Sequence, residues 1–335
     1  MSNLTISDIA KMAGVSTTAV SFVLNDRPGV SDKTREKVRA IIRETGFTPN
    51  VHTRRLNLGK SFTINVVLRK FRQSVFNQFA LETLSGIFTE SKSLGYSIIF
   101  TFVDQMGTSE VLESVRSKDC DGVILYQNSD MQLIELLEAE KIPFVCVDSH
   151  VKQDGKVALV DVDYYSAAMV ATHYLNDCGH RRIGFVGPEA NNSFFLSTYG
   201  GWSDALKERK LMVRSEWVFV TSMSEEGVKL AVQKLLSTES RPTALFCAGD
   251  SVAVHVLREL KEAGLRVPDD ISIMSIDDLL VSRYVDPPLS TMTFNKELLG
   301  EKAVRILYQI MQREKYEPVN LIRTSPIIRK TVKKI

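Results

Sequence analysis

The stretch Thr5–Asn25, TISDIAKMAGVSTTAVSFVLN, decides the fold of the first part of the chain. Thr5 and Asp8 have the three-residue spacing of a capping box, and Gly14 is typical of the position just past a helix end. Ser16 follows a tight turn, where its side chain can cap a second helix. The stretch therefore predicts two short helices joined by a glycine-containing turn.

The second of these helices has two faces of different chemistry. At about 100° per residue, Val20, Val23 and Leu24 cluster on one side. The opposite arc carries Thr17, Thr18, Ser21, Phe22 and Asn25. A solvated helix face usually carries Glu and Lys, and this arc carries neither. With a third helix expected over residues 32–45, after Ser31, the pattern predicts a helix-turn-helix whose second helix enters the major groove of DNA.

Phe22 admits two interpretations. Its ring can belong to the edge of a small core, or it can pack on a thymine methyl group beside Thr18. We assign base readout to Thr17, Thr18 and Phe22. Because hydroxyl and amide groups also bond phosphates, we assign positioning on the DNA backbone to Thr5, Ser16, Ser21, Asn25, Ser31 and Asn50.

Charge is unevenly distributed along the 335 residues. The chain carries a net charge of +2, yet residues 1–60 hold ten Lys/Arg against five Asp/Glu. A basic head on a slightly acidic body indicates that the head meets a polyanion. No apolar run approaches the ~20 residues that cross a bilayer, and the first residues lack the pattern of a signal peptide. We therefore expect a cytoplasmic protein without a membrane partner.

After residue 61, short β-rich apolar runs alternate with amphipathic stretches of ten or more residues. This rhythm predicts parallel sheets with crossover helices, arranged as two doubly wound lobes with a ligand crevice at the strand ends. The runs are INVVL, YSIIFTF, DGVILY, IPFVCV, RIGFVG, TALFCAG and ISIMSID. The body contains no phosphate-binding glycine motif, no hydrolase motif and no Cys/His metal spacing. We expect neither an enzyme nor a bound metal or cofactor.

The segment TISDIAKMAGVSTTAVSFVLNDRPGVSDKTREKVRAIIRETGFTPN resembles the DNA-binding head of the lactose-repressor (LacI/GalR) family. Three body segments, DVDYYSAAMVATHYLNDCGHRRIGFVG, RPTALFCAGDSVAVHVLRELKEAGLRVPDDISIMSIDD and RYVDPPLSTM, resemble its effector domain, which is similar to periplasmic sugar-binding proteins. The resemblance implies an all-α helix-turn-helix head (1–48), a hinge (49–60) and an α/β, two-lobed effector-binding and dimerisation domain (61–335). The chain should cross between the lobes near residues 161, 290 and 320.

The resemblance also implies a function for the hinge. Its sequence NVHTRRLNLGK matches a segment that folds in the DNA minor groove, paired with its dimer mate. Leu56 matches the leucine that wedges between the central base pairs and bends the DNA. Arg54 and Arg55 supply charge between the phosphates.

The effector site departs from the family pattern. Thr198 and Gly249 stand where sugar-binding members usually have Arg and Asn. Asp148 and Asp277 match acidic family positions, and Asp250 is either a third such residue or a helix cap. Two sugar-hydroxyl partners are thus missing, which leaves room for a protein coregulator or for no small ligand at all.

Cations follow the first strand of the body, where this chain has RKFRQSVF and the family often reads something like PDISNPFF. Arg69, Lys70 and Arg72 at this position can hold an anion such as a phosphorylated sugar or a uronate. The alternative is a solvated basic loop or a contact with a partner protein. Phe71 and Phe76 can stack on a sugar ring. The predicted effector set is therefore Arg69, Phe71, Arg72, Phe76, Asp148, Thr198, Asp250 and Asp277.

These patterns favour a DNA-binding transcriptional repressor. A short recognition helix makes few base contacts, so we expect a homodimer on a palindromic operator. A carbohydrate-type effector, with phosphorylated and acidic sugars among the candidates, would change lobe orientation and hinge spacing. The alternative is a regulator that needs a protein corepressor or has no small-molecule effector.

Overall fold

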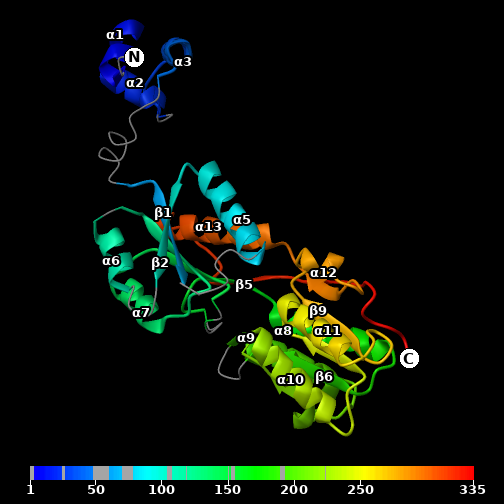
Figure 1. Ribbon diagram of the computed structural model, residues 1–335. Helices are drawn as coiled ribbons and strands as arrows, with labels where there is room; N and C mark the ends of the chain where they lie inside the picture. The colour runs from blue at the N-terminus through cyan, green and yellow to red at the C-terminus, as the bar shows by residue number, and fades with distance from the viewer. Residues whose placement is uncertain are drawn as a thin grey trace. The chain divides into compact units, whose positions relative to one another are not determined.

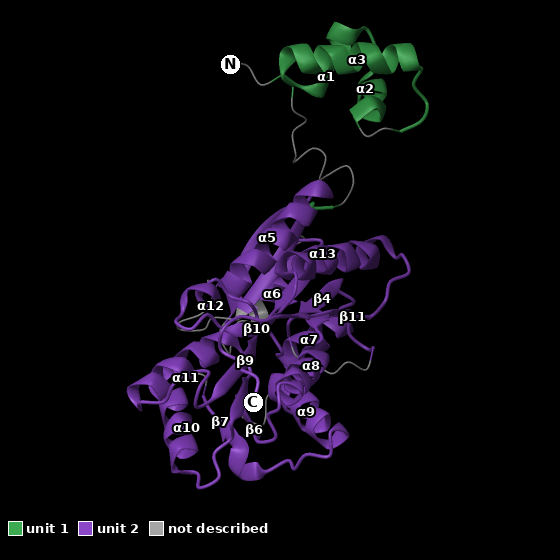
Figure 2. Cartoon of the chain, turned by 90° about the vertical axis from the view of Figure 1, so that its right-hand side faces the viewer, with its two compact units in different colours: residues 1–62 green, residues 63–335 purple. Residues whose placement is uncertain are grey.

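The computed structural model describes residues 4–24, 27–47, 60–69, 78–103, 108–117, 119–149, 151, 155–188, 193–222 and 224–335. The chain divides into two compact units, residues 1–62 and residues 63–335 (Figure 2). None of the helices in this described part is long and apolar enough to cross a membrane.

The first unit is the predicted three-helix head. Its helices are α1 (Ile6–Ala13), α2 (Thr17–Leu24) and α3 (Asp32–Thr45). Thr5 forms the predicted capping box with Asp8, and Gly14 ends α1 in the left-handed conformation, with φ 67°. The buried side chains of this small core are Ile9, Ala10, Ala13, Val20, Val23, Val38 and Phe47.

The second unit contains two lobes, each built on a six-stranded sheet (Figure 1). The first sheet has the order β11-β5-β4-β3-β1-β2, and its paired strands run parallel. The strands are β1 (Thr63–Arg69), β2 (Ser97–Val103), β3 (Gly122–Tyr126), β4 (Phe144–Val147), β5 (Leu159–Val162) and β11 (Val319–Ile322). The helices of this first lobe are α5 (Gln78–Ser93), α6 (Thr108–Arg116), α7 (Met131–Ala139) and α13 (Lys296–Gln312).

The second sheet has the order β12-β10-β9-β8-β6-β7, and only β12 runs antiparallel to its neighbour. The strands are β6 (Ile183–Gly187), β7 (Val218–Val220), β8 (Ala244–Cys247), β9 (Ser272–Ile276), β10 (Ser290–Thr293) and β12 (Ser325–Ile327). The helices of this second lobe are α8 (Tyr164–Asp177), α9 (Ser193–Glu208), the short 3₁₀ helix η1 (Ser215–Trp217), α10 (Glu225–Ser237), α11 (Asp250–Glu262) and α12 (Val281–Tyr284).

Burial explains why these strands read as continuous apolar runs. Every residue of β3, β6, β8 and β9 is buried, because helices cover both faces of each sheet. In the first lobe, α5 and α13 pack closely: a Cβ atom on Gly86 would lie 2.0 Å from the Glu297 carbonyl oxygen, and one on Gly300 would lie 2.1 Å from that of Thr83. The predicted α/β body of two doubly wound lobes is confirmed.

The chain passes between the two sheets three times. It leaves the first sheet after Val162, returns to the first lobe after Thr293, and leaves it again after Ile322. Parallel sheets present the carboxyl ends of their strands along one edge, and side chains that follow those ends meet there. This edge carries the acidic residues predicted for the effector site.

Candidate DNA-binding face and effector site

The recognition helix α2 presents the predicted hydroxyl groups to solvent. Thr17 and Thr18 are exposed, while Ser21 and Phe22 are half-buried. The helix carries no acidic and no basic residue. An acid-free face of this kind can approach phosphates and base edges without charge repulsion.

The Phe22 ring has a packing contact within the head. A Cβ atom on Gly29 would lie 3.2 Å from the Phe22 ring, so the ring packs against the turn that follows α2. Phe22 as a whole is half-buried, so contact with DNA stays a prediction.

The three predicted phosphate-contacting hydroxyls at helix starts also organise the head. Ser16 Oγ accepts a hydrogen bond from the Ala19 amide at 3.1 Å, and Ser31 Oγ accepts one from the Thr34 amide at 3.3 Å. Thr5 donates its hydroxyl proton to the Asp8 carboxylate at 2.7 Å. These caps define where the three helices of the predicted DNA-binding head begin. The predicted residues Asn25, Asn50, Arg54, Arg55 and Leu56 lie outside the described residues.

At the effector site, Asp148 and Asp161 lie on adjacent strands of the first sheet. Strands β4 and β5 pair Val147 with Val160, so the next residue of each strand is one of the two acids. Asp148 and Asp161 are only 2% and 3% exposed. Burial raises the pKa of Asp161 well above its ordinary value, and the neighbouring charge of Asp148 raises it further.

The Asp148 carboxylate has partners from both lobes. Gln127, after β3, donates to it from Nε2 at 2.7 Å, and the Tyr164 hydroxyl, at the start of α8, donates at 2.8 Å. The Tyr164 ring packs edge-on against Phe194, with ring centroids 4.6 Å apart.

Asp277 brings a third carboxyl group from the second lobe. Burial raises its pKa well above the ordinary value, the charges of Asp250 and Asp148 raise it further, and Lys296 lowers it. Asp148 belongs to the first lobe and Asp250 to the second, so carboxyl groups of both lobes raise the pKa of Asp277.

The backbone around these acids is strained. Gln127, Asp148, Asp277 and Asp278 all have positive φ values, of 48°, 46°, 127° and 51°. Such conformations cost energy for residues other than glycine and concentrate at functional sites. Positive-φ residues therefore follow strand ends in both lobes, next to the predicted acids.

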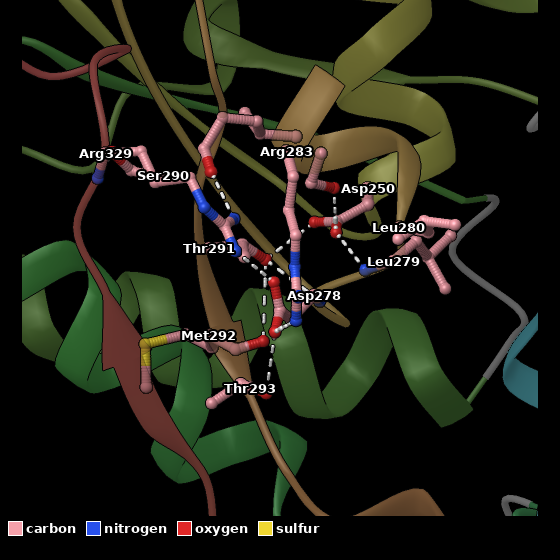
Figure 3. Close-up of polar contacts among 12 residues, drawn as sticks. Asp250, Asp278, Leu279, Leu280, Arg283, Ser290, Thr291, Met292, Thr293 and Arg329 are labelled. Atoms are coloured by element: carbon pink, nitrogen blue, oxygen red, sulfur yellow. Dashed lines mark hydrogen bonds and ion pairs between the residues drawn. The ribbon is translucent and has the colours of Figure 1, made fainter. Parts of the chain in front are cut away.

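Asp250 has a structural role instead of the predicted effector contact. It is the first residue of α11, and Gly249 occupies the cap position. Its carboxylate accepts hydrogen bonds from four groups, which occupy both oxygens (Figure 3). The donors are the hydroxyls of Ser275, Ser282 and Thr291 and the Leu279 amide, the last at 2.8 Å. Its place in the effector set is therefore corrected, because a saturated carboxylate has no capacity left for a ligand.

Asp278 forms a second network beside it. Its carboxylate pairs with Arg329, which follows β12, and with Arg283 of α12 at 3.4 Å (Figure 3). Burial raises the pKa of Asp278, but the hydrogen bond and charge of Arg329, with those of Arg283, outweigh it and hold the pKa below its usual value. The two networks hold the loop that contains Asp277 against β10 and against the segment after β12, which lie beside the lobe crossings.

The other members of the effector set divide into two groups. Thr198 is fully buried in α9, and its hydroxyl donates to the Phe194 carbonyl at 2.7 Å, so it offers no group to a ligand. The Arg69 side chain and residues Lys70, Phe71, Arg72 and Phe76 lie outside the described part of the structure.

Sequence reasoning missed Asp161, Tyr126 and Tyr164 as members of this site. Asp161 entered only as a marker of a lobe crossing. All three lie at or next to the carboxyl ends of strands, and that position is the signal that could have found them, whereas Asp148 and Asp277 were predicted from their match to acidic family positions. Among the described residues, no group of His, Cys, Asp and Glu side chains has the arrangement of a metal site.

Comparison with known proteins assigns both units. Residues 5–50 match the model of bacterial regulatory proteins of the lacI family, and residues 172–332 match a periplasmic binding protein-like domain. The ribose operon repressor of Haemophilus influenzae is 32% identical over 96% of this chain and 98% of its own length. The transcriptional repressor PurR of the same species is 32% identical over 99% of both chains.

Solved structures agree with this assignment. The lac repressor dimer bound to operator and an anti-inducer superposes with a TM-score of 0.80 at 26% identity, covering 99% of this chain and 100% of that one. A transcriptional regulator CelR–cellobiose complex gives 0.75 at 25% identity, covering 98% and 99%. These relatives are transcriptional regulators, which confirms that the chain is a DNA-binding regulator and not an enzyme. The chain belongs to the lacI family of bacterial regulatory proteins.

Proposed function

We propose that the protein is a cytoplasmic repressor that binds a palindromic operator as a homodimer. The acid-free face of α2, with Thr17 and Thr18 exposed, carries this proposal. Thr17, Thr18 and Phe22 read base edges in the major groove, and the capping hydroxyls of Thr5, Ser16 and Ser31 position the head on phosphates. Leu56 and the two hinge arginines act in the minor groove at the operator centre.

An exposed apolar surface supports dimerisation through the first lobe. Strand β2 is an edge strand of its sheet, and Phe100 and Phe102 on it are 50% and 42% exposed. Leu81 and Phe88 on the neighbouring helix α5 are also exposed. Edge strands with apolar side chains are usually covered, and a second copy of the chain is the partner that a palindrome requires.

The proposed effector is a small carbohydrate-type molecule held between the strand ends of the two lobes. The carboxylates of Asp148 and Asp277 accept hydrogen bonds from hydroxyl groups. One relative named for the ribose operon and one neighbour solved with cellobiose agree with this class. A phosphorylated or acidic sugar is less well matched, because carboxyl groups dominate the described part of the site.

Selection from random DNA tests this function. The full chain should enrich one palindromic sequence with two half-sites about one or two helical turns apart. Its binding should weaken steeply as salt rises, because phosphate contacts release counterions. Enrichment of no sequence, or of an unpaired half-site bound by a monomer, would contradict the proposal.

A further inference from the structure

Strand β3 ends in a buried hydroxyl group without a partner. Tyr126 is the last residue of the strand and is 2% exposed, and its hydroxyl makes no hydrogen bond with the described residues. Burial raises the pKa of Tyr126 well above its ordinary value, although the nearby Thr83 hydroxyl opposes this shift, so the group stays protonated at neutral pH. Thr83 donates its own proton to the Phe79 carbonyl at 3.0 Å. A buried polar atom such as the Tyr126 oxygen usually has a bound partner.

The sheet face on which Tyr126 lies is covered by α13. Successive residues of a strand alternate between the two faces. Val123 and Leu125 pack into the apolar core with α6 and α7, so Gly122 and Tyr126 lie on the other face. A Cβ atom on Gly122 would lie 3.0 Å from the Leu307 side chain of α13. The Tyr126 ring is therefore on the α13 side of the sheet.

Helix α13 places its early turns beside the carboxyl end of β3. Leu307, near the end of the helix, faces Gly122 at the start of the strand, so the helix runs back along the strand. From Gly122 to Tyr126 the strand advances about 13 Å, a length that about nine helical residues span. Tyr126 is therefore level with about Gly300. A Cβ atom on Gly300 would lie 2.1 Å from the Thr83 carbonyl oxygen, which agrees with the nearness of Thr83 to the Tyr126 hydroxyl.

A buried lysine lies one helical turn before Gly300. The Lys296 side chain is only 3% exposed. Its ammonium nitrogen lies 3.8 Å from the Glu82 carboxylate and 4.9 Å from the centroid of the Phe294 ring, and neither contact is a hydrogen bond. The Glu82 carboxylate accepts a hydrogen bond from Gln78 Nε2 at 2.6 Å instead. In these contacts the charge of Lys296 is balanced, but its three N–H donors are unused.

The two donors adjoin the proposed effector acids. Tyr126 pairs with Val147 across β3 and β4, and Asp148 is the next residue after Val147. Lys296 acts on Asp277: burial raises the pKa of Asp277, and the lysine charge opposes that shift. Tyr126 and Lys296 therefore belong to the strand-end region in which effector binding is proposed.

We propose that Tyr126 and Lys296 form a donor subsite of the effector site, which holds an uncharged oxygen acceptor of the ligand such as a sugar hydroxyl or carbonyl oxygen. This inference rests on the proposed carbohydrate effector and names two side chains that select it. The phenol and the ammonium group both donate, and a sugar oxygen has lone pairs to accept. Because Glu82 already balances the ammonium charge, the missing partner is an acceptor and not a counter-charge.

Neutral sugars test the subsite on the full chain. At least one of ribose, glucose, galactose and cellobiose should raise the melting temperature of the unsubstituted protein. Tyr126→Phe should weaken binding of that sugar about threefold or more, and Lys296→Met about tenfold or more, because a charged donor contributes more than a neutral one. Tyr316→Phe and Lys92→Met are exposed control changes in the first lobe and should leave binding unchanged.

The stability of the free variants separates ligand contact from a structural role. Free Tyr126→Phe protein should melt at the same or a higher temperature, because the removed hydroxyl has no partner among the described residues. Free Lys296→Met protein should do the same, because a buried ammonium group with unused donors is replaced by an apolar chain. A lower melting temperature of either variant would show that its group has a partner within the protein and would overturn the inference.

The binding data can contradict the subsite in three further ways. These are no response of the unsubstituted protein to any of the four sugars, unchanged sugar binding in either variant, and binding of glucose 6-phosphate about tenfold or more tighter than glucose. The last result would make Lys296 the counter-charge of an anion.

Operator binding by the same preparation separates the two proposals. Tight operator binding together with any of these contrary results refutes only the donor subsite. Failure to bind a selected operator refutes the proposed regulator function, whatever the response to sugars.

Discussion

The Tyr164 hydroxyl of the second lobe donates a hydrogen bond of 2.8 Å to the Asp148 carboxylate of the first lobe. Both side chains are buried. The bond therefore links the lobes next to a crossing of the chain, at the place where effector binding is proposed. A ligand that competes for Asp148 changes this link directly, which gives the effector a physical route to lobe orientation.

Replacing Tyr164 with Phe should lower the free energy of unfolding by about 1.5–3 kcal/mol, because a buried charged acceptor loses a donor. The ring packing against Phe194 is retained. Urea unfolding measures the change. Tyr165→Phe is the matched control, since the Tyr165 hydroxyl donates at 3.0 Å to Asp204, whose side chain is 43% exposed, and its loss should change stability little. Equal changes in the free energy of unfolding would show that the interlobe bond stabilises the protein no more than the surface bond does.

Asp161→Asn should stabilise the protein at neutral pH. The folded protein holds the pKa of Asp161 well above its unfolded value, so the folded state keeps a proton that the unfolded state has lost. Stability contributed by this group is complete at pH values below the unfolded pKa and is lost as pH rises through the folded pKa. The advantage of the Asn variant should therefore be large at about pH 8 and small near about pH 4. Urea unfolding at several pH values measures it, and a constant advantage would contradict the prediction.

Asp250→Ala should reduce the free energy of unfolding by roughly 3 kcal/mol or more, because four donors lose a buried charged acceptor together. The exposed Asp269→Ala on the same lobe is the control and should change stability little. If Asp250 were instead a ligand contact, its replacement would weaken effector binding with little loss of stability. Paired unfolding and binding measurements distinguish the two roles.

Thr18→Ala should weaken binding to the cognate operator by about 1–3 kcal/mol and leave nonspecific DNA unaffected. The reason is that the exposed Thr18 side chain lies on the face of α2 proposed to reach base edges. Fluorescence anisotropy at matched salt measures both affinities. Equal losses on both DNAs would assign Thr18 to phosphate contacts alone.

The helices of the head and the alternation of strands and helices in the body were predictable from the sequence, because both follow from local patterns. Thr5, Gly14 and Ser31 act within a few residues of themselves, so their capping roles are readable directly. The buried strands are readable because parallel sheets require apolar residues on both faces.

The effector site was only partly predictable because its partners are distant in sequence. Asp250 resembles a ligand residue until Thr291, 41 residues later, is seen to donate to it. Asp161 becomes a site residue only through the register of β4 and β5. Tyr164 becomes a hydrogen-bond partner of Asp148 because the chain crosses between the lobes next to it.

The most direct measurement of the central claim is binding of the purified full chain to its selected operator, compared with a scrambled sequence of equal length and composition. At near-physiological salt, specific binding should be about a thousandfold or more tighter than nonspecific binding. One dimer should bind each palindrome, and Thr18→Ala should remove much of the difference. Equal affinity for the operator and the scrambled DNA would contradict the assignment of α2 as a sequence-reading helix.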